Sequence, residues 1–421
     1  MALSASVRVN YNADESMSEN ISSQITGFSY TDVASGKSDS INISLMNVNK
    51  EWISSKMPQK GATLQATIKT KEWRQGEPAF DCGVFLLDDI SFSGRPLNCN
   101  IGAVSAPNNE DFKTKKKTIT WQSTTLKDVA QKISKAANLQ LYYSGNNIKI
   151  TDLEQSEETD SAFLYGLCEK YGFSMKVFNK KIIIFETAEA EQKAAVLTID
   201  EKEMNSWSYN TSINGSYTGI EFNYTDPDAK SKDKQTIKVF IGKQGRIYSV
   251  KQQATSKYDA ELQAKALLAK ANRSIDTLTV TIRANNLLVA GQCVQIKGLG
   301  KINGKYYIEQ IKHSIGNGYN MQLSMYCIEH DKAKTSNGSG GGNGSNNSTT
   351  DYKTISYTIS SSDTLWAIAK RFLGDGKRYP EIYELNKDII ETTARSRGMT
   401  SSDNGHWIFK GTVIKIRVPE V

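Results

Sequence analysis

The sequence predicts a mainly β protein with an α+β insert, followed by a flexible linker and a small β-α-α-β module. Short runs in which apolar and polar residues alternate dominate two blocks of the chain, as in half-buried strands. Between these blocks the apolar spacing changes to that of helices. Near the C-terminus a run of Gly, Ser and Asn contains no large apolar residue. The predicted segments are 1–112 (β domain), 113–194 (α+β insert), 195–333 (β domain), 334–352 (linker) and 353–421 (small module).

The first β domain shows its strands through alternation. Apolar residues are separated by polar ones over 41–45, and the same pattern recurs over 64–68. Residues 84–87 form a continuous apolar run, as in a strand buried on both faces, and residues 90–92 alternate again. Short strands at this close spacing are typical of a small barrel or sandwich.

The insert has helical and strand patterns in succession. Thr125, with Asp128 three residues later, predicts a capped helix start. Asn179 and Lys180 predict the turn of a later hairpin. Since a helix followed by two strands occurs two times, we predict a helix–hairpin unit that is used twice. The predicted elements are a helix with its apolar stripe over 126–133, strands 139–143 and 148–150, a helical stripe over 164–171 and a hairpin over 173–185.

The second β domain contains one predicted helix, Tyr258–Arg273, which is rich in Ala, Leu and Lys. The remaining apolar pattern is that of strands. The predicted strands lie at 220–224, 237–241, 278–282, 294–296 and 321–325.

Charge and hydropathy narrow the function classes. The net charge of +7 is spread along the 421 residues, and the one basic cluster, Lys113–Lys117, lacks interleaved aromatic residues. A solvated segment is therefore favoured over a phosphate-binding patch, and we predict no specific nucleic-acid site. No apolar run is long enough for a membrane span. Residues 1–11 lack the features of a secretory signal, so we expect folding in the cytoplasm of the cell that makes the chain.

Residue patterns for catalysis are also missing. The five cysteines are far apart with no CxxC pair, which favours small buried apolar residues over disulfides or zinc ligands. The three histidines form no metal-binding motif, and we interpret His313, in a strand-like segment, as a packed or interface residue. Asp88 and Asp89 are adjacent on a predicted strand, so they point to opposite faces and do not act on one bond. We predict no catalytic residue, no metal and no cofactor.

Four segments, taken in order, resemble one known family. They are DSINISLMN (Asp39–Asn47), CGVFLLDDISFSGRP (Cys82–Pro96), WQSTTLKDVAQKIS (Trp121–Ser134) and INGKYYIEQIKHSIGNGYNMQLSM (Ile302–Met325). This set is similar to the phage late control protein D family, the baseplate hubs of contractile tails. The resemblance covers residues 1–330, and it is the order of the segments that makes it specific.

The resemblance implies two tube-like β-barrels per chain, one on each side of the α+β domain. Three chains then form a ring of six similar barrels, which adapts a sixfold tail tube to a threefold spike. It implies a homotrimer that contacts the tail tube protein and the central spike protein, with tape-measure and wedge proteins as further candidate partners. The implied location is the baseplate of a virion or phage-tail-like particle assembled in the host cytoplasm. A phage, a tailocin and another contractile injection system all fit.

The module after the linker has the pattern of two strands and two helices. Residues 355–359 alternate as a strand, and Ser361 or Ser362 begins a helix whose Asp363 favours its N-terminal end. Pro380 suits the first turn of a second helix. Residues 414–418 alternate as the last strand. The order is therefore β-α-α-β.

The segment YTISSSDTLWAIAKRF (Tyr357–Phe372) resembles the opening of a LysM domain, a fold that binds N-acetylglucosamine-containing glycans between two loops. The sequence departs from the LysM pattern at Ser362, where Gly is usual, and in a long second loop predicted over 387–410. Trp407, with His406 beside it, is a candidate for stacking on a sugar, although covering a small core is the favoured interpretation for such a Trp. The candidate glycan-binding residues implied by the resemblance are Asp363, Thr364, Leu365, Asn386 and Trp407.

Two other functions fit parts of the sequence. A LysM module after a flexible linker is a common arrangement in cell-wall hydrolases, and a non-enzymatic glycan-binding protein would also use such a module. The module itself has two candidate roles, which are binding peptidoglycan and docking on another tail component. A structural hub remains the leading hypothesis because the family-like segments span most of the chain while catalytic motifs are missing.

Overall fold

The computed structural model divides the chain into two compact units, residues 1–334 and 335–421, and each is described by itself. The predicted linker, 334–352, lies outside the described residues apart from Tyr352. The described residues are 4–71, 73, 79–105, 111–213, 216–225, 236–331, 352–360, 363–373, 376–397, 399–403 and 405–419.

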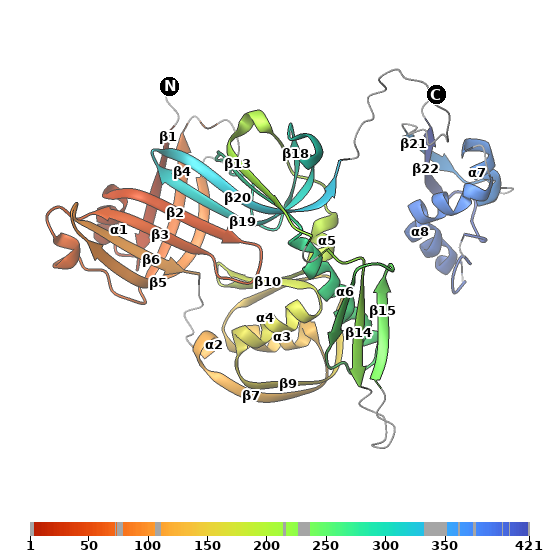
Figure 1. The fold of residues 1–421 in the computed structure, drawn as a ribbon, viewed down its shortest axis with the longest axis horizontal. Coiled ribbons are helices and arrows are strands. Elements are labelled where there is room, and N and C mark those ends of the chain that lie inside the picture. The colour runs from red at the N-terminus through yellow and green to blue at the C-terminus, as the bar shows by residue number, and fades with distance from the viewer. Residues whose placement is uncertain are drawn as a thin grey trace. The chain divides into compact units, whose positions relative to one another are not determined.

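The first unit is built on one twelve-stranded sheet (Figure 1). Its strands come from both predicted β domains, which are joined where β2 pairs antiparallel with β19, with Val33 opposite Gln310. The N-terminal strands are β1 (Ser4–Tyr11), β2 (Ile25–Val33), β3 (Ser40–Met46), β4 (Thr63–Lys71), β5 (Ala79–Ser93) and β6 (Asn98–Val104). The C-terminal strands are β12 (Thr198–Asp200), β13 (Met204–Thr211), β17 (Asp276–Arg283), β18 (Cys293–Lys297), β19 (Gly304–Gly316) and β20 (Gly318–His330).

The two halves of this sheet repeat one strand order. The neighbours β4-β5-β6-β3-β2 in the first half correspond to β18-β19-β20-β17-β13 in the second, in the same chain order. All neighbouring pairs within these two sets are antiparallel. The outermost strands differ, because β1 runs antiparallel to β4 whereas β12 runs parallel to β18. The chain therefore contains one five-strand unit twice, with the insert between the copies.

The apolar residues of the predicted alternating strands form the core. The apolar residues of 41–45 and 64–68 are fully buried, and one hydrophobic cluster includes residues of both halves. Two features differ from the prediction. β5 is a single strand of 15 residues rather than two short ones. Helix α1 (Glu15–Ser23) was missed, because Ser18 and Ile21 are its buried residues and leave no apolar stripe to recognise.

The insert forms its own hydrophobic core. The predicted cap is confirmed, since the Thr125 hydroxyl accepts a hydrogen bond from the Asp128 N–H at 3.2 Å. The predicted second hairpin is also confirmed, with Asn179 and Lys180 at positive φ in its turn. The elements are α2 (Asp111–Thr114), β7 (Lys116–Thr125), α3 (Leu126–Ala136), β8 (Gln140–Ser144), β9 (Lys149–Thr159), α4 (Asp160–Lys170), β10 (Phe173–Phe178), β11 (Lys181–Glu186) and α5 (Thr187–Gln192).

The first predicted hairpin is wrong. β8 pairs parallel with β11, and β9 pairs antiparallel with β7, so that β8 and β9 belong to different sheets. A short apolar run predicts a strand but carries no information about its partner. Here β8 extends the buried β10–β11 hairpin, whereas the mostly exposed β9 runs beside the mostly exposed β7.

A separate three-stranded sheet lies within the range predicted as the second β domain. Its order is β15-β14-β16, and helix α6 packs on it with a small core of its own (Figure 1). The predicted helix over 258–273 is confirmed as α6. The elements are β14 (Gly219–Thr225), β15 (Thr236–Gly242), β16 (Ile247–Lys251) and α6 (Lys257–Arg273).

The second unit has the predicted β-α-α-β order, and its two strands pair antiparallel. The predicted loop over 387–410 is wrong in its first part, because α8 continues to Ser396. Ile390 and Ala394 follow Asn386 at four-residue spacing and are buried, so they extend the inner face of the helix. The elements are β21 (Tyr352–Thr358), α7 (Leu365–Leu373), α8 (Tyr379–Ser396) and β22 (Val413–Pro419).

The overall composition of the fold agrees with the predicted class, which is mainly β with an α+β insert and a LysM-like module. Among the described residues, no helix combines the length and the apolarity that a membrane crossing requires.

Candidate functional site

Asp363 fixes the loop that leads into α7. Its Oδ2 accepts hydrogen bonds from the backbone N–H and the hydroxyl of Ser360, at 2.7 and 2.6 Å, and from the Tyr357 hydroxyl at 2.8 Å. Burial acts to raise the carboxyl pKa, but these hydrogen bonds outweigh it and hold the pKa below its ordinary value. Asp363 is therefore an ionised residue that organises the loop. Ser362, the departure from the LysM pattern, lies outside the described residues.

The next two candidates begin helix α7. The Thr364 hydroxyl accepts a hydrogen bond from the Ala367 N–H at 3.1 Å, as an N-cap does. Leu365 is 2% exposed and packs into the core of the module. Thr364 thus caps the helix and Leu365 is part of the core, and Thr364 also lies at the surface.

Asn386 joins helix α8 to strand β22. Its Nδ2 donates to the carbonyls of Ile382 and Lys415, at 2.8 and 2.7 Å, and its Oδ1 accepts from the Lys415 N–H at 2.7 Å. The side chain is 6% exposed. Both amide hydrogens and the amide oxygen are used inside the fold, so Asn386 has no amide hydrogen left to donate to a ligand.

The segment after α8 is held by Glu391. Its carboxylate accepts hydrogen bonds from the backbone N–H and the hydroxyl of Ser402 and, at 2.9 Å, from the Tyr383 hydroxyl. Gly405, at φ +80°, lies against Leu365, since a Cβ at this glycine would come 2.4 Å from the Leu365 Cδ1. The segment therefore packs against the start of α7, and the two predicted loops meet there.

Trp407 lies on this anchored segment. Its backbone N–H donates to the Ser402 carbonyl at 2.9 Å, and its ring centroid lies 5.0 Å from that of His406, edge to face. The side chain is 48% exposed. Of the five candidate residues, Trp407 thus presents an aromatic surface to solvent on a fixed backbone, whereas Leu365 and Asn386 belong to the core.

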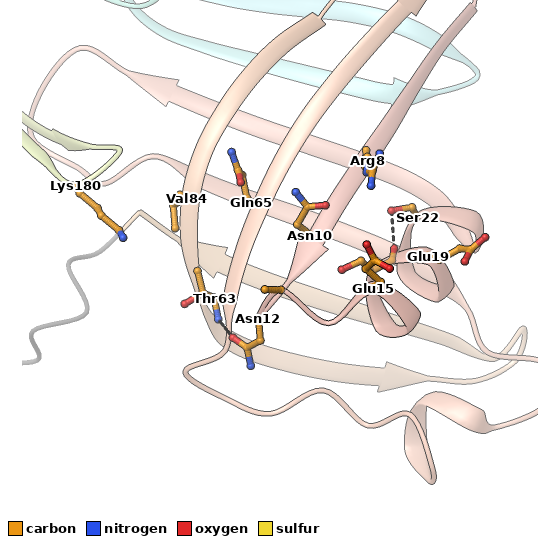
Figure 2. A pocket seen from close by; sticks show the side chains of 12 residues that line it. Arg8, Asn10, Asn12, Glu15, Glu19, Ser22, Thr63, Gln65, Val84 and Lys180 are labelled. Atoms are coloured by element: carbon orange, nitrogen blue, oxygen red, sulfur yellow. Dashed lines mark hydrogen bonds between the residues drawn. The ribbon is translucent and has the colours of Figure 1, made fainter.

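A polar hollow of about 1090 Å³ lies in the first unit, over β1, β4 and β5 (Figure 2). Asn10 and Gln65 stand on its floor, Glu15 and Glu19 of α1 line one side, and Lys180 of the β10–β11 turn reaches in from another. Amides, hydroxyls and charges of both signs suit contact with a polar chain or surface. The hollow could not be recognised in the sequence, because its lining comes from four separate segments.

A buried ion cluster joins the insert to both halves of the sheet. Lys176 of β10 lies 2.6 Å from Asp32 and 3.3 Å from Asp39, and all three side chains are at most 12% exposed. The second oxygen of Asp32 accepts a hydrogen bond from the Ala290 N–H at 2.7 Å. Three sequence-distant segments therefore meet at one point. The acids, Asp32 within β2 and Asp39 directly before β3, were the available sequence signal, but their cation lies more than 130 residues away.

Asp88 and Asp89, which were considered for catalysis, are exposed neighbours on β5, whereas His313 and His330 lie on β19 and β20. Asp88 is the extra residue of a bulge in β5 and acts electrostatically on Lys113, whereas Asp89 lies over Gly102. Within the described ranges, no group of three or more His, Cys, Asp or Glu side chains is arranged to hold a metal ion. Lys117 of the basic cluster forms a 2.5 Å ion pair with Asp160.

His313 is fully buried between the rings of Tyr30 and Phe80, with centroids 5.3 and 5.0 Å away. Its Nδ1 lies 2.7 Å from the Tyr319 hydroxyl, which donates its own hydrogen to Asn286. The Nδ1 must therefore carry the hydrogen in that contact. Burial lowers the pKa of the imidazole to about 3. The prediction of a packed histidine is confirmed.

Comparisons with known proteins agree with this arrangement. A YQBQ-like family model matches residues 173–326, and a LysM domain model matches residues 357–393. A probable baseplate hub protein of Escherichia phage 186 is 22% identical over 232 residues, which are 53% of this chain and 58% of that protein. A probable baseplate hub protein of Escherichia phage P2 is 25% identical over 208 residues, 48% of this chain and 51% of that protein.

The solved structures give the same fold. A tail protein from Neisseria meningitidis MC58 superposes with a TM-score of 0.59 at 10% identity, over 77% of this chain and 97% of that one. The matches span about half the length of the curated hub proteins. The resemblance to phage baseplate hub proteins and the LysM assignment of the last unit are thereby confirmed.

Proposed function

We propose, starting from this likeness to baseplate hub proteins, that the chain is a structural hub subunit of a contractile phage tail or phage-tail-like particle. In this proposal three copies form a ring that adapts the sixfold tail tube to the threefold spike. The observation that supports it best is the five-strand unit that occurs twice in one sheet. A chain with two similar halves gives six similar units in a closed ring of three, so that one ring matches both symmetries.

The proposed partners follow from this position. One face of the ring contacts the tail tube protein and the other contacts the central spike protein, with tape-measure or wedge proteins as further neighbours. The buried cluster of Lys176, Asp32 and Asp39 supports a rigid adaptor, because it holds the insert to both halves of the sheet. The proposed location is the baseplate, after assembly in the host cytoplasm.

Imaging of assembled particles tests the proposal. A version of the chain with an epitope tag at its C-terminus is expressed from the producing genome, and purified particles are labelled with an antibody and examined by electron microscopy. We expect label at the end of the tail that carries the baseplate. Particles of normal shape that carry no label, from cells that make the tagged chain, would contradict the proposal.

A cell-wall hydrolase is the alternative, since the last unit matches a LysM model. Among the residues considered for catalysis, Asp88 and Asp89 lie at a bulge of β5 and His313 is fully buried, so they lend this alternative no specific support. A suspension of peptidoglycan that keeps its turbidity in the presence of the full chain would agree with the structural role. Clearing of the suspension would overturn it.

For the LysM-like unit we propose a binding role in which the Trp407 ring stacks on its ligand, either a peptidoglycan glycan or a tail component. The exposed indole on a fixed segment supports this role. The test compares the full chain with a Trp407→Ala variant for retention on purified peptidoglycan at low salt. Glycan binding predicts retention that falls at least tenfold in the variant. No retention of the unaltered chain would favour docking on a tail component.

A further inference from the structure

We infer that, in the ring, strand β13 of one copy pairs antiparallel with the end of β5 of the next copy, with Ser208 opposite Ser93. This inference rests on the proposed trimer and adds to it the strands and the register of the contact between subunits. It is drawn from the internal junction between the two five-strand repeats, where β2 pairs with β19.

The register of the internal repeat follows from two bulges. The β5–β6 ladder is interrupted between Leu87 and Asp89, and the β19–β20 ladder between Ile308 and Gln310. Aligning these bulges places Ile90 at the position of Ile311. Bulges are specific features of a ladder and fix the register on both sides.

The same alignment carries through the sheet to its other strands. It places Phe28 of β2 at the position of Trp207 in β13, and these two strands have a second pair of matching irregularities, between Ile25 and Gly27 and between Met204 and Ser206. Two independent interruptions in each half therefore coincide. A chance likeness of strand order would not reproduce both.

The side-chain contacts of the two five-strand repeats also coincide. The Tyr30 hydroxyl donates to Asp39 at 3.2 Å, and the Tyr209 hydroxyl, at the equivalent position, donates to Asp276 at 2.7 Å. Asp39 and Asp276 are also equivalent in the register, because they directly precede two equivalent residues. These are Ser40, which pairs with Thr31, and Thr277, which pairs with Asn210. The five-strand unit is thus repeated in its contacts and not only in its topology.

The repeat predicts which strand should pair with the free edge of β13. Within the chain, β2 of the first five-strand repeat pairs with β19 of the second repeat, with Tyr30 opposite His313 and Ser29 opposite Ser314. The equivalent of β2 is β13, and the equivalent of β19 is β5. Transferring the register places Tyr209 opposite Phe92 and Ser208 opposite Ser93, so the pair of serines occurs at both junctions.

Both strands of the inferred junction have a free edge at the residues that the junction would pair. In the described part of the chain, β13 pairs with β17 alone, and residues 89–93 of β5 pair with β6 alone. Trp207 on β13 is 44% exposed. It would stand opposite Gly94, where no side chain competes for the space. An exposed edge strand with a large aromatic residue is a surface that proteins normally cover.

The other free end of the sheet is partly closed. On β1, the N–H groups of Val9 and Tyr11 donate to the hydroxyls of Ser22 and Ser18 of α1, at 3.0 and 2.8 Å. These donors point away from β4, so α1 occupies the half of this edge nearest to it. A strand of a second copy therefore finds fewer free backbone groups at β1 than at the end of β5. This agrees with the internal junction, where β2 pairs with β19, the equivalent of β5, next to β18.

Disulfide cross-linking tests the register in the full chain. The variant carries Ser93→Cys and Ser208→Cys, and a matched control carries Ser29→Cys and Ser314→Cys at the internal junction. Opposed positions on paired strands lie within the distance that a disulfide spans. The native cysteines are buried or partly buried, and the unaltered chain, oxidised in parallel, reports any reaction of their own. Products are separated without reducing agent after mild oxidation, and the mass in solution is measured beforehand.

We expect the Ser93/Ser208 variant to give covalent dimers and trimers, while the control closes its disulfide within one chain. A particle of trimeric mass that gives no cross-link, although the control closes, would overturn the inferred register and leave the proposed ring standing. Cross-links in a Ser6→Cys and Ser208→Cys variant instead would show pairing at β1 and would also overturn it. A chain that stays monomeric at all concentrations would contradict the ring and the register together.

Discussion

Trp207 in β13 holds the position in its five-strand unit that Phe28 holds in the other, yet Trp207 is 44% exposed and Phe28 is 4% exposed. The difference arises because β19 lies beside β2, whereas no strand in the described part of the chain lies beside β13 on that side. In the proposed ring, the surface beside Trp207 is therefore the one that a neighbouring copy covers.

A charge at Trp207 should weaken the proposed trimer. In the inferred junction, Trp207→Asp removes a large buried aromatic surface and adds a carboxylate without a partner, which we expect to cost about 2 kcal/mol or more per junction. The midpoint of subunit dissociation should rise at least tenfold in concentration, as measured by analytical ultracentrifugation. Trp366→Asp, at a 50% exposed Trp of the second unit, is the matched control. Equal midpoints for both variants would place the contact elsewhere.

His313 should give the fold a specific dependence on pH. Its pKa is about 3 in the folded state and 6.5 as the ordinary value, so the unfolded chain binds the proton more readily. The stabilisation is complete above pH 6.5 and is lost as the pH falls towards 3, at about 1.4 kcal/mol per pH unit. Urea unfolding of the first unit at several pH values measures this slope.

The His313→Phe variant isolates that contribution. Phenylalanine keeps the ring among Tyr30 and Phe80 but does not take up a proton, so the slope below pH 6.5 should fall by about 1.4 kcal/mol per pH unit. His406→Phe, in the second unit, is the matched control for a histidine-to-phenylalanine change outside the first unit. The account of His313 would be refuted by identical slopes in the unaltered chain and in His313→Phe.

Removing the cation of the buried cluster should be costly. Lys176→Met leaves Asp32 and Asp39 without their buried partner, and breaking such a pair typically costs about 3–5 kcal/mol. We expect a lower free energy of unfolding in urea, with part of the loss recovered when Asp32→Asn and Asp39→Asn are added. Lys180→Met, at the surface turn four residues later, is the control. A loss below about 1 kcal/mol would show that the cluster does not hold the segments together.

Asn386 should matter for folding of the LysM-like unit rather than for its ligand. Asn386→Leu leaves the N–H and the carbonyl of Lys415 unpaired, which we expect to cost about 1–3 kcal/mol. The melting temperature of the unit, followed by calorimetry, should fall. Trp407→Ala should leave it nearly unchanged, since the indole is half exposed. The reverse pattern would assign Asn386 to the ligand and Trp407 to the core.

Local signals in the sequence predicted local structure well. The pair Thr125 and Asp128 predicted a capped helix, and Asn179 with Lys180 predicted a hairpin turn, because both depend on residues within a few positions of one another. The partner of a strand depends on distant residues. For this reason the pairing of β8 with β11 and the separate sheet of β14 were not predicted.

The candidate site was predicted less completely than the fold. The resemblance to LysM identified Leu365 and Asn386 by position, but burial and the contacts with Lys415 become visible only in three dimensions. The repeat of the five-strand unit was hidden for a similar reason. Residues at equivalent positions of the two ladders, such as Phe28 and Trp207, often differ in residue type.

The mass of the full chain in solution tests the central claim most directly. Sedimentation equilibrium at micromolar concentration should give three times the 46.7 kDa of one chain, because the proposed hub is a closed ring of three. A single species at 46.7 kDa over the whole concentration range, from protein that also fails to enter particles, would contradict the account.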